Sequence, residues 1–271
     1  MKATKIIFAS ILCATSLLYA IGTKQVIIIA PSDETTLAVK TQLSPADSLL
    51  DAGITSSNEK KSGRWEILFD GKNTDQWKSI NADSFPSHAW KIEDGTLSVD
   101  NHAKDGDIIT REVYADFDLL FDFKLTDGAN SGIKYFVDYI KDNTSGKMLY
   151  NGPEYQVIDD YNHPYLKDKQ HPDATTAALY LIYAPKNKKL FPAGEWNSGR
   201  IVAKGNHLEH WLNGIKVVSC ERGSKDFRDR MAITKFNSYD HYGELPAGHI
   251  MLTDHDGDKV YFRNIKIKRL K

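Results

Sequence analysis

The stretch DFDLLFDFKLT, residues 116–126, decides the fold because apolar and polar side chains alternate along most of its length. The apolar positions are spaced two apart: Phe117, Leu119, Phe121, Phe123 and Leu125. The positions between them include Asp118, Asp122 and Lys124. Successive side chains of a strand point to opposite faces. The pattern therefore predicts a long strand with one face in a core and the other in water.

Many other short segments carry the same kind of signal. They are WEILFD (65–70), WKIEDGTLSVD (90–100), SGIKYFVDY (131–139), PEYQVID (153–159), AALYLIYA (177–184), GRIVAKG (199–205), HLEHWL (207–212), IKVVS (215–219), HIMLTDHDG (249–257) and KVYFRNIKIKRL (259–270). Asp94-Gly95, Asn213-Gly214 and Asp256-Gly257 supply turn signals between strands. Only KDFRDRMAITKF (225–236) has a helical pattern. We predict an all-β, two-sheet jelly-roll sandwich with one or two short helices.

The composition is that of an ordinary globular protein. Of 271 residues, 41% are hydrophobic and 26% are charged. Lys and Arg number 35 against 36 Asp and Glu, so no global field attracts nucleic acid or an anionic membrane. We expect no nucleic-acid partner, and no membrane contact beyond the N-terminal segment.

The N-terminus predicts export to the periplasm or the cell surface. Lys2 and Lys5 precede an uncharged stretch, Ile6–Gly22, which is the layout of a signal peptide over residues 1–22. A retained membrane anchor is the alternative, since the stretch is barely shorter than a spanning helix. Lipid attachment at Cys13 is disfavoured because bulky Leu12 precedes it. The polar composition of residues 30–63 predicts a disordered linker, whose bounds we place at 23–63, and the folded domain is expected over residues 64–271.

Several motifs resemble one family in order and spacing. They are LFDGKNTDQW (68–77), WKIEDGTL (90–97), NSGIKY (130–135), GPEYQVID (152–159), GEWNSGRIVAKGNHLEHWLNGIKVV (194–218) and VYFRNIKIKRL (260–270). Together they resemble the 3-keto-disaccharide hydrolase family, whose fold is of the concanavalin A-like lectin/glucanase type. The resemblance implies cleavage of glycosides whose sugar carries a ketone at carbon 3. Two departures are Lys134-Tyr135, where the family usually has an arginine, and Thr253, where it usually has a glutamine.

The segment GPEYQVID bears on the chemistry. In a strand, Glu154, Gln156 and Ile158 share one face, so this face offers a single carboxylate. A retaining glycosidase needs two carboxylates about 5 Å apart, and the second would have to come from another strand, with Asp254 the obvious candidate. Elimination from a 3-keto sugar needs one base and a stabilised enolate oxygen. We therefore predict Glu154 as base, Lys134 as the cation and His255 as proton donor to the leaving oxygen.

Around these residues we predict a carbohydrate-binding set. It comprises Gln156, Asp159, His163, Trp196, Asn197, Tyr135 and Asp254. Trp196 beside its turn could equally be a sugar platform or a core residue. The loop containing His163 and His171 is expected to close over the groove.

No cofactor is certain from the sequence. A divalent cation bound by His163, His171 and Asp160 is one interpretation, although their spacing matches no defined ligand motif. His207 and His210 point to opposite faces of a strand, which argues against a zinc pair.

Three functions remain open at this point: a 3-keto-glycoside-cleaving enzyme, a non-catalytic carbohydrate-binding module, and an ordinary two-carboxylate glycoside hydrolase. The environment of Glu154 distinguishes them. If Glu154 is a catalytic base, it should lie at the bottom of a groove near a cation. In a lectin it would lie on a shallow binding face, and in a retaining hydrolase a second carboxyl group would lie close to it.

Overall fold

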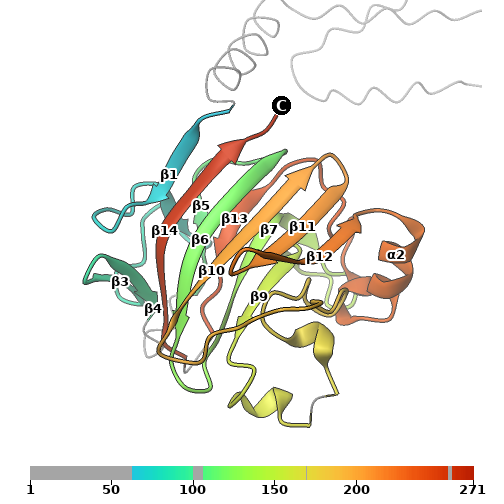
Figure 1. Ribbon diagram of the computed structural model, residues 1–271. Coiled ribbons are helices and arrows are strands. Elements are labelled where there is room, and N and C mark those ends of the chain that lie inside the picture. Colours follow the sequence, from blue (N-terminus) through green and yellow to red (C-terminus); the bar gives the residue numbers. More distant parts are fainter. Residues whose placement is uncertain (1–62, 100–105, 169, 256–257) are drawn as a thin grey trace, which may run out of the picture. The chain divides into compact units, whose positions relative to one another are not determined.

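The computed structural model describes residues 63–99, 106–168, 170–255 and 258–271. Two antiparallel sheets form a sandwich, as the alternating patterns predict (Figure 1). The predicted signal peptide, the linker and the Asp256-Gly257 turn lie outside the described residues. Within the described part of the chain, no helix is both long and apolar enough to cross a bilayer.

The larger sheet has eight strands in the order β12-β11-β10-β6-β14-β4-β3, with β1 paired to β14. Their bounds are β1 Trp65–Phe69, β3 Trp90–Glu93, β4 Thr96–Val99, β6 Phe117–Leu125, β10 Trp196–Lys204, β11 His207–Leu212, β12 Ile215–Glu221 and β14 Val260–Arg269. β14 contains a bulge between Arg263 and Lys266, where Asn264 has a positive φ of 54°. The bulge explains why the apolar alternation of this strand shifts by one position.

The smaller sheet carries the site. Its order is β2-β5-β13-β7-β8, with β9 also paired to β7. The bounds are β2 Trp77–Ser79, β5 Ile108–Thr110, β7 Asn130–Lys141, β8 Met148–Asn151, β9 Glu154–Ile158 and β13 His249–Leu252. β8 and β9 pair with successive parts of β7, so their side chains can converge over one long strand.

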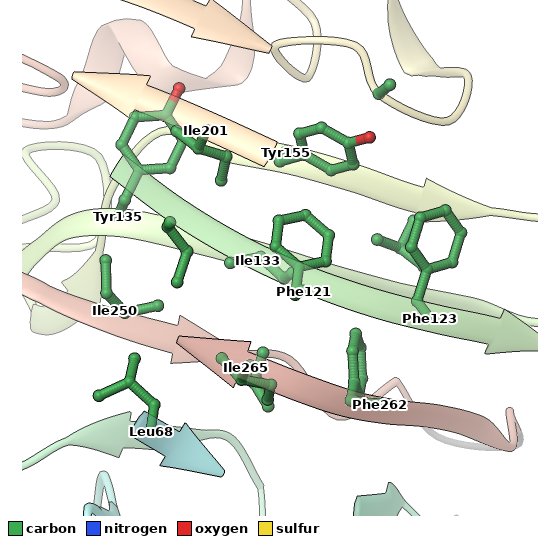
Figure 2. Close-up of a cluster of buried hydrophobic side chains, with 14 of the residues drawn as sticks. Leu68, Phe121, Phe123, Ile133, Tyr135, Tyr155, Ile201, Ile250, Phe262 and Ile265 are labelled. Atoms are coloured by element: carbon green, nitrogen blue, oxygen red, sulfur yellow. The ribbon is translucent and has the colours of Figure 1, made fainter. Parts of the chain in front are cut away.

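The core lies between the two sheets, and β6 forms its centre as expected. The five alternating apolar residues of β6 are all at most 4% exposed. Ile133, Tyr135 and Tyr155 face them from the smaller sheet (Figure 2). Phe121 and Tyr155 meet edge to face with their ring centroids 5.2 Å apart. Trp77 and Trp90 are fully buried, whereas Trp65 is 39% exposed under Lys266 and Lys268.

The expectation of a strand over 177–184 is wrong. This segment forms buried turns, with positive φ values of 68° at Ala177 and 62° at Leu181. Its backbone nevertheless covers the free edge of β9: Ala177 N donates to Gln156 O (2.8 Å) and Tyr180 N donates to Glu154 O (3.0 Å). An unbroken apolar run shows burial but does not show how the backbone is arranged.

In the described residues, helical structure is confined to short pieces. α2 spans Lys225–Ala232 and begins at Ser224, whose side chain accepts a hydrogen bond from Phe227 N. A separate 3₁₀ turn, η3, spans Lys235–Ser238, so the helix expected over 225–236 is divided. The loop after β9 holds two more 3₁₀ turns, η1 Pro164–Leu166 and η2 Pro172–Ala174.

Acid is expected to destabilise the domain through His210 on β11. The ring is 1% exposed, its Nδ1 donates to Ala177 O (3.1 Å), and its Nε2 accepts from the Tyr135 hydroxyl (2.8 Å). Burial lowers the pKa of His210 from 6.5 to about 4. The unfolded chain therefore takes up the proton first as the pH falls, and stability present above pH 6.5 is lost on the way to about pH 4.

A shift of this size corresponds to roughly 3 kcal/mol in the free energy of unfolding. Urea unfolding at neutral pH and near pH 4.5 should show the loss. The slope of stability against pH in this window should be smaller in His210→Gln. An unchanged slope in that variant would assign the acid sensitivity to other groups.

Candidate functional site

A cavity of about 550 Å³ lies on the outer face of the smaller sheet. Its floor is made by side chains of β7, β8 and β9, and one wall comes from η3. The lining residues are Asn130, Lys134, Asp142, Thr144, Asn151, Glu154, Gln156, Tyr180, Lys235, Phe236, Ser238, Tyr239 and His255. All three predicted catalytic residues, Glu154, Lys134 and His255, are therefore brought together with Gln156.

The strand register explains how the floor is built. In the β7–β9 ladder, Lys134 lies opposite Glu154 and Gly132 lies opposite Gln156. The Glu154 carboxyl extends over Gly132, where a Cβ would come within 2.0 Å of Glu154 Oε1. The glycine in the motif NSGIKY thus makes the space that the carboxylate occupies. We did not predict this role from the sequence.

Glu154 is a buried carboxylate in a cationic setting. Glu154 is only 5% exposed. Desolvation raises the pKa of Glu154, and the neighbouring Lys134 and Lys235 partly oppose that rise, while Asp107 adds to it. A carboxylate with a raised pKa is a stronger base, and the two cations allow it to ionise despite its burial.

Lys134 and Gln156 are held in defined positions. Lys134 Nζ donates to Asn151 Oδ1 (3.3 Å), an acceptor that also takes the backbone N–H of Gly152 (3.0 Å). Gln156 is 3% exposed, and its Oε1 accepts from Val157 N (3.2 Å). Its NH₂ group is therefore the one that it can offer to a ligand.

His255 lies at the mouth of the cavity with an exposed side chain. Desolvation by the cavity wall lowers the pKa of His255, and the charges of Lys134 and Lys235 lower it further, against an opposing contribution from Asp107. The imidazole is therefore largely uncharged at neutral pH, which makes it a weak proton donor.

Three of the predicted carbohydrate-binding residues belong to other parts of the fold. Tyr135 is fully buried in the core, with its hydroxyl on His210. Asn197 is 2% exposed and bonds the backbone N and O of Phe191, so it fixes a loop. Trp196 lies on β10 of the other sheet, with Lys124 and Arg263 over its ring. These three residues lie in or beside family motifs, but alternate residues of a strand face opposite sides, so proximity to a motif does not place a side chain in the site.

Three further candidates are also absent from the lining of the cavity. Asp159 is 1% exposed and accepts hydrogen bonds from the backbone N–H groups of Gly128 (2.9 Å) and Tyr161 (3.0 Å). His163 caps η1 by accepting from Tyr165 N. Asp254 donates its backbone N–H to Asp107 Oδ1 (2.8 Å). Their polar groups stabilise the loops that surround the site.

The proposed cation ligands are not assembled into a cluster. Asp160 forms an ion pair with Lys188 and accepts from Thr176 N (2.8 Å), and His171 stacks on Tyr165 with centroids 4.9 Å apart. Among the residues that the structure describes, no group of three or more His, Cys, Asp or Glu side chains could hold a metal ion. The described residues of the loop that bears them contribute no side chain to the cavity lining.

Other lining residues were missed. Asn151, Tyr180 and Lys235 carry no motif that would single them out, and they come from β8, the turns after residue 177 and η3. Only the folded arrangement places them beside Glu154. Asn130 is the exception, since it lies in the quoted motif NSGIKY; its Oδ1 is buried without a hydrogen-bond partner among the described residues.

Comparison with solved structures agrees with this architecture. A candidate glycosyl hydrolase from Parabacteroides distasonis is 33% identical, with a TM-score of 0.67 over 79% of this chain and 97% of that one. A second candidate glycosyl hydrolase from the same organism is 26% identical, with a TM-score of 0.56 over 77% of this chain and 100% of that one. These similarities support the sandwich and a glycoside-directed function.

Sequence comparison is more specific. A 3-keto-disaccharide hydrolase from Bacteroides thetaiotaomicron is 33% identical over 229 residues, which cover 75% of this chain and 77% of the relative. The profile of the 3-keto-alpha-glucoside-1,2-lyase-like domain matches residues 64–268. The chain is accordingly an enzyme that acts on glycosidic bonds, and it belongs to the 3-keto-alpha-glucoside-1,2-lyase-like domain family.

Proposed function

We propose that this enzyme cleaves glycosides bearing a ketone at carbon 3, by base-initiated β-elimination followed by addition of water. The observation that carries the proposal is one buried carboxylate, Glu154, opposite Lys134 on the floor of a cavity. The name of the Bacteroides thetaiotaomicron relative supports the same substrate class. Carbohydrate is thus the proposed binding partner.

The geometry suits the first step. A ketone at carbon 3 acidifies the hydrogen on carbon 2, and Glu154 would remove that proton. The electron pair moves to the ketone oxygen, where Lys134 stabilises the enolate. Carbon 3 then regains its double bond to oxygen, carbons 1 and 2 become joined by a double bond, and the bond from carbon 1 to the glycosidic oxygen breaks. Gln156 would orient the sugar by a hydrogen bond.

The carboxylates near Glu154 favour elimination over a two-carboxylate mechanism. Asp142 is the other acid in the described lining, and it already accepts from Ser145 Oγ (2.6 Å) and Thr144 N (3.0 Å). Asp107 interacts electrostatically with Glu154, and it accepts from Asp254 N. A shallow lectin face is also a poorer match, because the acid lies buried at the base of a cavity.

The test compares a plain β-glucoside with the same glucoside oxidised at carbon 3, each with and without a chelator. We expect cleavage of the keto form alone, with a primary isotope effect when carbon 2 carries deuterium. Cleavage of the plain glucoside without that effect would instead indicate a two-carboxylate hydrolase, with Asp107 as the first residue to replace. Saturable binding without cleavage of either would indicate a lectin. Loss of activity with the chelator would show that a divalent cation takes part.

Export to the periplasm or the cell surface is a further part of the proposal, and it depends on the signal-peptide pattern of residues 1–22. Fractionation of cells expressing the full chain would test it. Retention in the cytoplasm would contradict it.

A further inference from the structure

Lys235 enters the cavity from outside the sandwich sheets. It opens η3, the 3₁₀ turn after α2, and Thr234 caps that turn by accepting from Phe236 N (3.1 Å). Phe236, the next residue, is 3% exposed and stacks on Tyr242 with ring centroids 4.3 Å apart. The backbone that presents Lys235 is therefore anchored in the core.

The same segment is also fixed to the hairpin formed by β7 and β8. Asn143 N donates to Ser238 O (2.7 Å), its Nδ2 donates to Asp240 Oδ1 (2.7 Å), and Asp240 N donates to Lys141 O (3.1 Å). These bonds join the η3 wall to the strand that carries Lys134. The backbone that carries Lys235 is thus held in a defined position beside the floor of the cavity.

The ammonium of Lys235 contacts aromatic rings. Its Nζ lies over the rings of Tyr180 (4.9 Å to the centroid) and Phe236 (5.4 Å). Within the described ranges we find neither a hydrogen bond nor an ion pair to Lys235 Nζ. Residue 235 is exposed, so its N–H groups are open to solvent and available to a molecule in the cavity that it lines.

Two cations border one base, but they are not equivalent. Lys134 lies opposite Glu154 in the β7–β9 ladder, and its Nζ donates a hydrogen bond to Asn151. This fixed position suits a positive charge that stabilises the enolate oxygen. Lys235 lies on the η3 wall, and among the described residues its Nζ has no hydrogen-bond acceptor. The elimination also requires a proton for the departing glycosidic oxygen. His255 is a weak donor of that proton because its imidazole is largely uncharged at neutral pH.

We propose that Lys235 is the general acid that protonates the leaving oxygen. The inference rests on the proposed elimination mechanism. As the bond from carbon 1 to oxygen breaks, an N–H bond of Lys235 donates its proton to that oxygen and the leaving group departs as an alcohol. Lys235 is then a neutral amine and Glu154 is protonated.

The addition of water restores both groups. A water molecule attacks carbon 1 and gives one proton to the neutral amine of Lys235, while Glu154 returns its proton to carbon 2. The product is the free 3-keto sugar, and no oxidant or further reactant is needed. Partial desolvation lowers the pKa of the Lys235 ammonium, as does the charge of Lys134, although Glu154 opposes the change. This direction brings its acidity closer to that of an effective acid catalyst.

The experiment compares leaving groups in the full-length enzyme. One substrate is the methyl 3-keto-glucoside, whose alkoxide needs a proton, and the other is the 4-nitrophenyl 3-keto-glucoside, whose phenolate departs without one. In Lys235→Met, we expect kcat/KM on the methyl glycoside to fall by about 10²-fold or more, the usual range for loss of an acid catalyst. On the nitrophenyl glycoside the change should stay within about threefold, since that step needs no acid.

Lys235→Arg separates the proton from the charge. Arginine keeps the positive charge but does not release a proton under these conditions. We expect it to behave like Lys235→Met on the methyl glycoside. Lys225→Met is the matched control, since Lys225 lies on the exposed side of α2 in a pair with Asp229, and both rates should stay unchanged. Thermal unfolding checks that each variant is folded.

The outcomes are distinct. An equal loss on both substrates, or recovery of the methyl reaction by arginine, would overturn the assignment of Lys235 as an acid and leave the elimination mechanism intact. If the unaltered enzyme cleaves neither keto substrate, the proposed function itself fails. A loss confined to the methyl glycoside in both lysine variants would support the inference.

Discussion

Glu154→Gln is expected to lower kcat/KM on a 3-keto-glucoside by about 10³-fold, within the range for removing a general base. Glutamine keeps the size and the hydrogen-bonding shape of the side chain, but it cannot accept the proton from carbon 2. Initial rates at a fixed pH give the measurement. The matched control is Glu195→Gln, an exposed position just before β10, which should leave the rate unchanged.

The same variant should change how activity and stability depend on pH. Burial raises the pKa of Glu154, so activity should increase as the pH rises through that raised value and should be lost below it. The unfolded chain ionises Glu154 first, so this residue costs stability once the pH exceeds its ordinary value of 4.5. Glu154→Gln should therefore unfold at the same or a higher temperature at neutral pH. Retention of more than about a tenth of the rate would exclude Glu154 as the base.

Gly132→Ala should inactivate the enzyme through its effect on Glu154. A Cβ at this position would meet Glu154 Oε1 at 2.0 Å and its carboxyl carbon at 2.8 Å, so the carboxyl group must move. A displacement of about 1 Å in a catalytic group can cost about 10² in rate, and we expect a loss of that size or larger. Gly132 has an ordinary strand conformation, since its φ is not among the positive values, so the backbone accepts alanine.

A double substitution tests the route of this effect. If Gly132→Ala acts only by displacing the base, then combining it with Glu154→Gln should cost no more than Glu154→Gln alone. Losses that multiply would show that the glycine serves the site in another way, for example by closeness of its backbone to the sugar. Thermal unfolding of the single variant separates both results from loss of the fold.

The fold could be predicted because its determining signals are local. The alternation in residues 116–126 fixes which side of β6 is buried, and the Asn213-Gly214 turn joins β11 to β12 as predicted. Residues 177–184 show where such signals end. An apolar run is compatible with any buried backbone, and here the hydrogen bonds to the edge of β9 favour turns over a strand.

The site could be predicted only in part. Glu154 and Gln156 follow from strand periodicity, and Lys134 from the resemblance to a family motif. Tyr135, Asn197 and Asp159 were predicted as carbohydrate-binding residues because they are polar residues near motifs, whereas the structure gives their polar groups hydrogen-bond partners within the protein. Lys235 and Asn151 were missed because nothing in the sequence relates η3 or β8 to β9. Their proximity arises from pairing and from loop contacts far apart along the chain.

The division of the cavity between β-sheet floor and η3 wall has a consequence for how the enzyme could diversify. The base and its nearest cation sit on paired strands, where register leaves little freedom. The η3 wall belongs to an excursion between β12 and β13, which is joined to the sandwich by hydrogen bonds and by the buried rings of Phe227, Phe236 and Tyr242. Changing this excursion around a retained Lys235 could alter which aglycone is accepted while Glu154 and Lys134 stay in place on the sheet. Removal of the proton from carbon 2 would then be inherited with the sheet, and the handling of the leaving group with the excursion.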